Sequence, residues 1–209
     1  MRQASITRAT GETDISITLN LDGSGRASLL YPIGFMKHML NTFAKHGLFD
    51  VDIKASGDLD VDQHHLVEDT GIVLGQCFAK ALGDKKGIAR VGSCLYPMDE
   101  TLARCAVDIS GRAFLVLDAQ LTGTPLVTVP ETANSAGTQE SFQTDVIEDF
   151  WQGFTAAAAI TLHLEILRGR SDHHKIEALF KALARALRQA CEIDSRAAES
   201  IPSTKGMLA

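Results

Sequence analysis

The chain lacks the features that would point to a nucleic acid or a membrane. Its net charge is −6, whereas a surface that binds phosphate backbones carries a basic excess. No apolar run reaches the ~20 residues that span a bilayer, and residues 1–14 lack the apolar core of a secretory signal. We therefore expect a cytoplasmic protein with neither a nucleic-acid partner nor a membrane partner.

Cysteine is scarce, and its spacing forms no pair that would bind a metal. The four cysteines, Cys77, Cys94, Cys105 and Cys191, lie far apart without a C-x-x-C motif. Cys77 and Cys191 fall in apolar helical patterns, which is typical of buried free thiols. We expect all four to be reduced, so any metal ligands must be histidines and carboxylates.

The hydrophobic pattern predicts one order of elements that occurs twice. Hydrophobic residues make up 45% of the chain, enough for a substantial core. The first half reads as a strand over 14–21, a hairpin turn at 22–25 with a return strand over 26–30, a helix over 35–46 stopped by Gly47, a strand over 48–55 and a helix over 64–82 ended by Gly83. The second half reads as paired strands within 107–121, a loop over 130–144, a helix over 148–160, a strand over 162–169 and a helix over 173–190.

This repetition predicts an α+β fold of two similar halves that arose by internal duplication. Each half would be a small mixed or antiparallel sheet packed on two helices. We place the halves at residues 1–92 and 93–195, folded together as one unit. Residues 196–209 are too polar to belong to the core, so they would form either a frayed tail or an ordered loop with a function, such as contact with substrate.

The motif His-His-x-x-Glu opens the last predicted helix of each half. It occurs at His64, His65 and Glu68 and again at His173, His174 and Glu177. Either histidine of a pair can share a metal with the glutamate, three or four residues on. Adjacent histidines diverge by about 100° around a helix, so one pair is placed to serve two ions. The duplicated motif predicts two metal centres that draw ligands from both halves, with Mn, Fe, Co, Ni or Zn as suitable metals.

The duplication also relates two further positions. His38 lies near the start of the helix before the first motif, and Asp149 is its counterpart in the second half. If His38 is a metal ligand, Asp149 is the symmetric one. His163 lies alone on a predicted strand, where a hydrogen-bonded structural histidine is the commoner case.

A third group of residues suits an anionic ligand. It comprises Arg90, Arg112, Lys181, Ser203, Thr204 and Lys205. Each alone is typical of a solvated surface. Together, in an acidic protein, they are consistent with a phosphate site of arginine forks, lysines and hydroxyls.

With these residues laid out, the chain resembles the imidazoleglycerol-phosphate dehydratases, a family of histidine-biosynthesis lyases. The similar segments run nearly end to end: ETDISITLNLDGSG, GFMKHML, KHGLFD, SGDLDVDQHHLVEDTGIVLG, ALGDKKGIARVG, PMDE, VDISGRA, TLH, HHKIEALFKALARALRQA and PSTKG. The resemblance implies a hydro-lyase that uses two Mn²⁺ ions per active site and dehydrates imidazole glycerol phosphate to imidazole acetol phosphate. It also implies a homo-oligomer of about twenty-four subunits with sites at subunit contacts.

The family's functional residues carry over position by position. The implied metal ligands are His38, His64, His65, Glu68, His173, His174 and Glu177. The implied substrate and phosphate contacts are His46, Arg90, Arg112, Lys181, Ser203 and Lys205, with Thr204 in the same loop. Glu12 matches a catalytic acid/base position, and we group His46 with it as a candidate catalytic residue.

Two positions depart from the family pattern. Lys37 stands where the family usually has an aspartate just before the ligand histidine, which removes an orienting carboxylate. Asp149 stands where many members have a metal-ligating histidine. Both departures concern the ligand shell of the metals.

The implied reaction needs metals because hydroxide is a poor leaving group. An imidazole bound between two metal ions loses its N–H more readily, and the electron-rich ring then expels the neighbouring hydroxyl. Two other functions use the same ligands: a dinuclear metal hydrolase of a phosphorylated metabolite, and a non-catalytic metal-binding protein. A hydrolase would release phosphate, and a storage protein would not need the basic residues.

Overall fold

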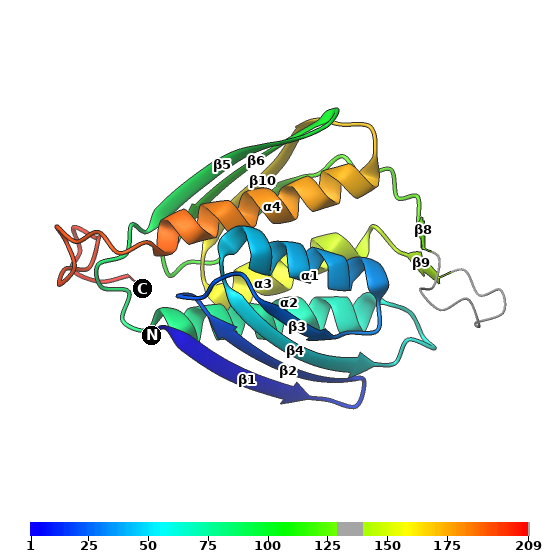
Figure 1. Ribbon diagram of the computed structural model, residues 1–209, viewed down its shortest axis with the longest axis horizontal. Helices are drawn as coiled ribbons and strands as arrows, with labels where there is room; N and C mark the ends of the chain where they lie inside the picture. The colour runs from blue at the N-terminus through cyan, green and yellow to red at the C-terminus, as the bar shows by residue number, and fades with distance from the viewer. Residues whose placement is uncertain (129–139, 209) are drawn as a thin grey trace.

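The computed structural model describes residues 1–128 and 140–208 and contains two four-stranded mixed sheets with four helices (Figure 1). The first half comprises β1 (Gln3–Ala9), β2 (Thr13–Asn20), β3 (Ala27–Leu30), α1 (Gly34–Gly47), β4 (Asp50–Gly57) and α2 (His64–Leu82). The second half comprises β5 (Val91–Met98), β6 (Thr101–Asp108), β7 (Phe114–Asp118), β8 (Leu126–Thr128), β9 (Glu140–Phe142), α3 (Val146–Ala158), β10 (Thr161–Arg168) and α4 (Asp172–Cys191).

The two halves have the same topology, as the duplication predicts. The sheet orders are β1-β2-β4-β3 and β5-β6-β10-β7, and in each sheet the last pair is parallel and the others antiparallel. The predicted α+β class with two similar halves is therefore confirmed. The proposed division at residues 92 and 93 stays a prediction, and it falls just inside β5.

Both predicted hairpins are wrong, because the strands that were expected to pair with each other do not. The turn at 22–25 does lead into a strand, but β3 pairs in parallel with β4 instead of returning along β2. Likewise β6 and β7 flank β10 and do not pair with each other. In each half a later strand inserts between the two predicted partners, because it buries its apolar residues there. The strands β1 and β5 were not predicted.

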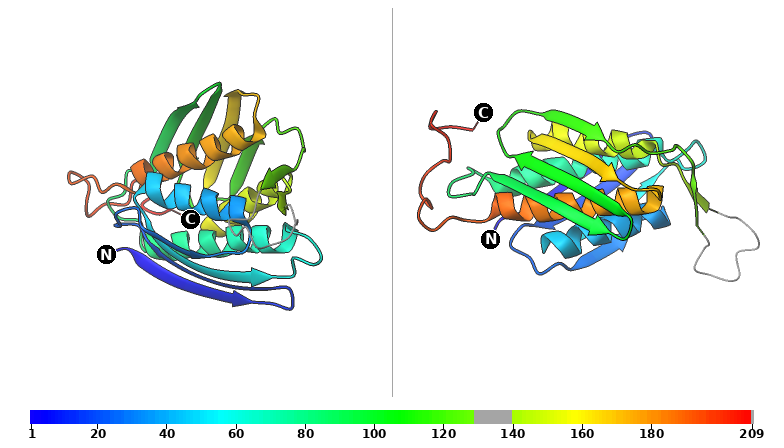
Figure 2. Two further views of the ribbon diagram at one scale, coloured as in Figure 1. Left: turned by 45° about the vertical axis from the view of Figure 1, so that its right-hand side comes forward. Right: turned by 90° about the horizontal axis from the view of Figure 1, so that it is seen from above.

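The helices form a layer between the two sheets (Figures 1 and 2). The strands turn alternate side chains toward this layer. Ile15, Ile17 and Leu19 of β2 are fully buried, while the residues between them face outward. Helices of opposite halves pack together, α1 on α4 and α2 on α3. The core therefore runs continuously through both halves.

Glycines permit the closest of these helix contacts. A Cβ on Gly75 of α2 would lie 2.5 Å from the carbonyl oxygen of Phe154 on α3. At the end of α1, Leu48 and not Gly47 takes the left-handed conformation, with φ of 55°. Gly47 is required instead because a Cβ there would meet the ring of Phe49. Gly83 does end α2, with φ of 61°.

The predicted loop over 130–144 lies mostly outside the described residues, and its described end contains β9, which pairs with β8. All four cysteines are free, and three of them are buried. Among the described residues, no helix is long and apolar enough to cross a membrane.

Candidate metal centre

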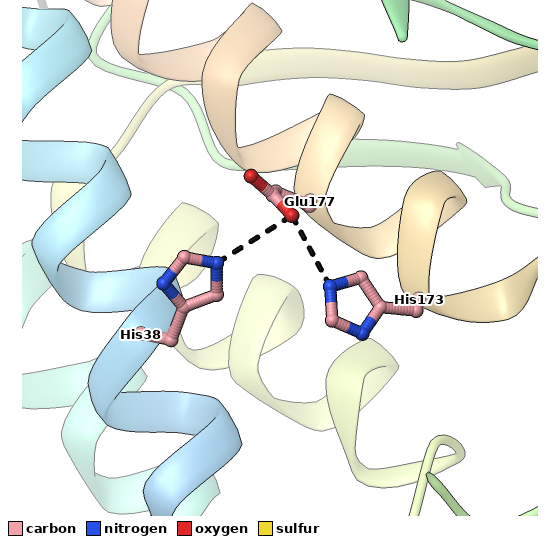
Figure 3. A group of neighbouring side chains, drawn as sticks. All are labelled: His38, His173 and Glu177. Carbon is pink, nitrogen blue, oxygen red and sulfur yellow. Dashed lines mark hydrogen bonds and ion pairs between the residues drawn. The ribbon is translucent and has the colours of Figure 1, made fainter. Parts of the chain in front are cut away.

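Three ligand candidates converge where α1 crosses α4 (Figure 3). His38 comes from α1, and His173 and Glu177 come from successive turns of α4. Oε2 of Glu177 lies 3.2 Å from Nε2 of His173 and 3.5 Å from Nε2 of His38. The ligand atoms of the three residues all lie within 4.8 Å of one another. Two halves of the chain therefore contribute to one cluster.

The carboxylate of Glu177 is held ionised in this cluster. Its side chain is 9% exposed, and Nζ of Lys181 lies 2.8 Å from Oε1, leaving Oε2 to the histidines. Burial acts to raise the pKa of Glu177, but the hydrogen bond and charge of Lys181, together with His38, outweigh burial and lower it. The ring of His173 also packs against the ring of Phe35 in a T-shaped arrangement, with ring centroids 5.1 Å apart.

The cluster fits a metal ion by chemistry and by spacing. Neighbouring ligands of one ion lie about 3.0–3.5 Å apart when the bonds are near 2.0–2.2 Å. The separations of 3.2 and 3.5 Å in the cluster fall at that spacing. Two imidazoles and a carboxylate suit Mn, Fe or Zn. His38, His173 and Glu177 therefore form a possible metal site.

The first motif lies beside α3. His64 is the first residue of α2, with Nδ1 3.3 Å from Oδ2 of Asp149 and Nε2 3.8 Å from Oε2 of Glu68. The contact between α2 and α3 thus places Asp149, which differs from the family pattern, beside the first motif. Its role as a ligand stays a prediction.

The second histidine of each motif contacts a carboxylate that the sequence did not single out. Nδ1 of His65 lies 3.0 Å from Oδ2 of Asp58, and Nδ1 of His174 lies 2.8 Å from Oε2 of Glu100. The hydrogen bond that His65 donates to Asp58 raises the pKa of His65. Glu12 lies further from the same ring, 3.9 Å from Nε2 of His65. One sequence signal could have identified Glu100: the triplet Asp-Glu-Thr at 99–101 occurs at the place in the second half that Gly-Glu-Thr, with Glu12, has in the first.

Arg90, one of the predicted anion-binding residues, contacts the C-terminal tail. The guanidinium of Arg90 pairs with Asp108 through two hydrogen bonds, of 2.7 and 3.0 Å, and donates to the carbonyl of Pro202 at 2.9 Å. Arg90 therefore holds the tail directly before Ser203. The Oγ atom of Ser203 accepts from the backbone N–H of Lys205 at 3.2 Å, which folds the Ser203–Thr204–Lys205 loop.

The remaining predicted residues lie on several different elements. His46 lies at the end of α1, 5.5 Å from the ring of Tyr96, and Lys181 lies over the same ring. Burial, then the charges of Lys181 and Arg185, lower the pKa of His46. Arg112 follows the turn at Ser110, and the backbone N–H of Arg112 donates a hydrogen bond to the hydroxyl of Ser110. His163 lies on the exposed face of β10, opposite Ala106 of β6.

The described part of one chain thus unites only some of the predicted ligands. His38, His173 and Glu177 meet in one cluster, whereas His64, His65 and His174 each meet carboxylates separately. The duplicated α+β fold and these histidine–carboxylate contacts define a class: a two-half α+β protein with a candidate metal site built from imidazoles and carboxylates.

Comparisons with known proteins narrow this class to one family. The family model described as "Imidazoleglycerol-phosphate dehydratase" matches residues 32–187. A protein of that name from Lacticaseibacillus casei is 53% identical over all of both chains, and one from Methylorubrum populi is 52% identical over all of both chains. The chain belongs to the imidazoleglycerol-phosphate dehydratase family, and it is accordingly a hydro-lyase of histidine biosynthesis.

Solved structures of two relatives have the same fold. The crystal structure of the Staphylococcus aureus dehydratase matches with a TM-score of 0.75 and 35% identity, over 92% of this chain and 99% of that one. The structure from Pyrococcus furiosus matches with a TM-score of 0.74 and 30% identity, over 97% of this chain and all of that one. The family predicted from the sequence motifs is therefore confirmed.

Proposed function

We propose that this protein dehydrates imidazole glycerol phosphate to imidazole acetol phosphate with two Mn²⁺ ions per active site. The observation that carries the proposal is the cluster of His38, His173 and Glu177, whose donor atoms are spaced as ligands of one ion. The second ion would be held by ligands drawn from His64, His65, Glu68, Asp149 and His174. When bound, the metal ions favour loss of the substrate's imidazole N–H.

Glu12 is the proposed acid/base in the proton transfers. It lies directly before β2, its side chain is 56% exposed, and it faces the ring of His65 at 3.9 Å. It is therefore near a proposed ligand yet open to a substrate. A carboxylate there would take the proton from the carbon adjacent to the one that bears the departing hydroxyl. Loss of that proton and of the hydroxyl gives an enol, which becomes the ketone.

The basic residues would hold the phosphate and so fix the ring and the hydroxyl relative to Glu12. Lys181 and His46 lie at one end of the site beside Tyr96. Arg90 positions the tail that carries Ser203, Thr204 and Lys205. Arg112 completes the proposed set.

The proposed assembly is a cytoplasmic homo-oligomer of about twenty-four subunits with active sites at subunit contacts. Two observations support contacts between subunits. The outer face of the second sheet exposes Val91 (56%), Leu95 (61%) and Phe114 (62%). In addition, among the described residues of their own chain, the ring nitrogens of His65 and His174 have polar contacts only with carboxylates, so a second subunit would complete their ligand sets.

The test combines metal analysis with a product assay. The purified protein should contain Mn²⁺ and should convert imidazole glycerol phosphate to a ketone without releasing inorganic phosphate. Release of phosphate would favour a dinuclear hydrolase, and metal binding without turnover would favour a non-catalytic metal-binding protein. Glu12→Gln should abolish most turnover, by about 10²–10⁴-fold, and leave substrate binding largely intact. Retained turnover in Glu12→Gln would refute the acid/base role.

A further inference from the structure

The duplication places a glutamate before the equivalent strand of each half, yet the two glutamates differ in their surroundings. Glu12 directly precedes β2 and Glu100 directly precedes β6, and each is followed by a buried threonine, Thr13 or Thr101. Glu12 is 56% exposed and stands 3.9 Å from its histidine, whereas Glu100 is 33% exposed and hydrogen-bonds to His174. Equivalent positions in the two halves therefore have different contacts.

Glu100 is held on both of its oxygens. Oε2 lies 2.8 Å from Nδ1 of His174, and Oε1 accepts the backbone N–H groups of Ser171 at 3.0 Å and of Arg170 at 3.3 Å. Ser171 is also the N-cap of α4, and its side chain accepts from the backbone N–H of His174. The carboxylate thus joins the start of β6 to the first turn of α4.

In the first half, Asp58 takes the corresponding place beside the second histidine. Oδ2 of Asp58 lies 3.0 Å from Nδ1 of His65, and the backbone N–H of Asp58 donates to the carbonyl oxygen of Glu12 at 3.1 Å. An ionised carboxylate only accepts hydrogen bonds, so in both contacts the histidine donates from Nδ1. This tautomer leaves the Nε2 lone pair for another partner.

We infer that Asp58 and Glu100 are positioning residues, which hold His65 and His174 by Nδ1 so that Nε2 of each ring is presented to a metal ion. This inference rests on the proposed metal-dependent function. A carboxylate on the far nitrogen of a ligating histidine fixes its tautomer and orientation and raises its basicity. Because Asp58 holds His65, Glu12 is left free for the proton transfers, whereas its counterpart Glu100 is committed to His174.

The test measures the binding of Mn²⁺ alone to full-length, chelator-stripped protein, with free Mn²⁺ followed by electron paramagnetic resonance. Glu100→Ala and Asp58→Ala should each weaken Mn²⁺ binding by about 10–100-fold. Asp84→Ala is the matched control: Asp84 is an exposed carboxylate whose nearest ion-pair partner is Lys86, 3.6 Å away. It should bind Mn²⁺ like the wild type.

A double-mutant cycle separates positioning from a purely structural effect. In a His174→Ala background, Glu100→Ala should cause no further loss of Mn²⁺ affinity, because the ring that it positions is gone. Equal affinities of Glu100→Ala and wild type, or full additivity with His174→Ala, would overturn the inference. A wild-type protein that binds no Mn²⁺ would instead refute the metal-dependent function itself, so the two failures are distinguishable.

Discussion

Replacing Gly75 with alanine tests the packing that joins the two halves at the site. Gly75 lies on α2, and the helix facing it, α3, carries Asp149. A Cβ at Gly75 would lie 2.5 Å from the carbonyl oxygen of Phe154, 2.9 Å from Cβ of Ala157 and 3.0 Å from the backbone nitrogen of Ala158. Two of these three atoms belong to the backbone, so no side-chain rotation relieves them.

The size of the effect follows from these distances. An ordinary contact begins at 3.4 Å, so α3 must retreat from Gly75 by roughly 0.9 Å in a core with few voids. Overpacking of this kind costs about 1–3 kcal/mol, and a backbone clash belongs at the upper end. Alanine regains about 1 kcal/mol through its higher helix propensity. The expected net loss is about 1–2 kcal/mol in the free energy of unfolding, or a fall in Tm of about 2–8 °C.

The assay is thermal unfolding followed by circular dichroism at one fixed protein concentration, together with Mn²⁺ binding. Gly34→Ala is the control, since a Cβ at Gly34 would meet nothing within 4 Å, and it should leave Tm unchanged or slightly raised. Because the retreat of α3 also moves Asp149 from its place 3.3 Å from His64, Gly75→Ala should weaken Mn²⁺ binding as well. A Gly75→Ala protein as stable as Gly34→Ala would refute the packing argument.

Three further substitutions test other contacts. Asp50→Asn removes the carboxylate whose pKa is lowered by hydrogen bonds from the side chain of Arg26 and from backbone N–H groups. The ionised Asp50 carboxylate stabilises the folded state above the unfolded pKa of about 4, and this stabilisation is lost as the pH falls below it. Asn should therefore flatten the decline in stability between about pH 5 and pH 2 in acid titrations. Lys175→Met leaves the buried Asp172 without its ion-pair partner at 3.2 Å, and urea unfolding should show a loss of about 3–5 kcal/mol; a loss under 1 kcal/mol would contradict this. Arg90→Lys cannot hold both Asp108 and the Pro202 carbonyl, so it should speed proteolysis of the tail and raise KM for the phosphorylated substrate more than it lowers kcat; unchanged proteolysis would show that Arg90 does not hold the tail.

Local signals determined most of the helices and the motifs that they carry. The helix predicted over 64–82 has those bounds in the structure. The helix predicted over 173–190 is one residue longer at each end, from Asp172 to Cys191. Apolar residues at helical spacing mark these segments, Gly83 ends the first and Ser171 caps the second. These features depend on neighbours within a few residues, which is why the sequence alone predicts them and the duplication that they reveal.

Strand partners were beyond the reach of the same reasoning. A turn signal at 22–25 correctly marks a change of direction, but β3 finds its partner in β4, across a whole helix. Strand pairing depends on which apolar faces are buried together, and segments far apart in the chain compete for the same sheet position. The alternation along one strand does not record the outcome of that competition.

The sequence by itself determined that this protein has two halves, each with a His-His-x-x-Glu motif at the start of a helix. Only the tertiary structure decided which carboxylate each histidine meets. His38 meets Glu177 because α1 packs on α4, and His64 meets Asp149 because α2 packs closely on α3. These contacts join opposite halves, where buried helix faces pack together and glycines let the helices lie close. Such contacts leave no periodic signal along the chain.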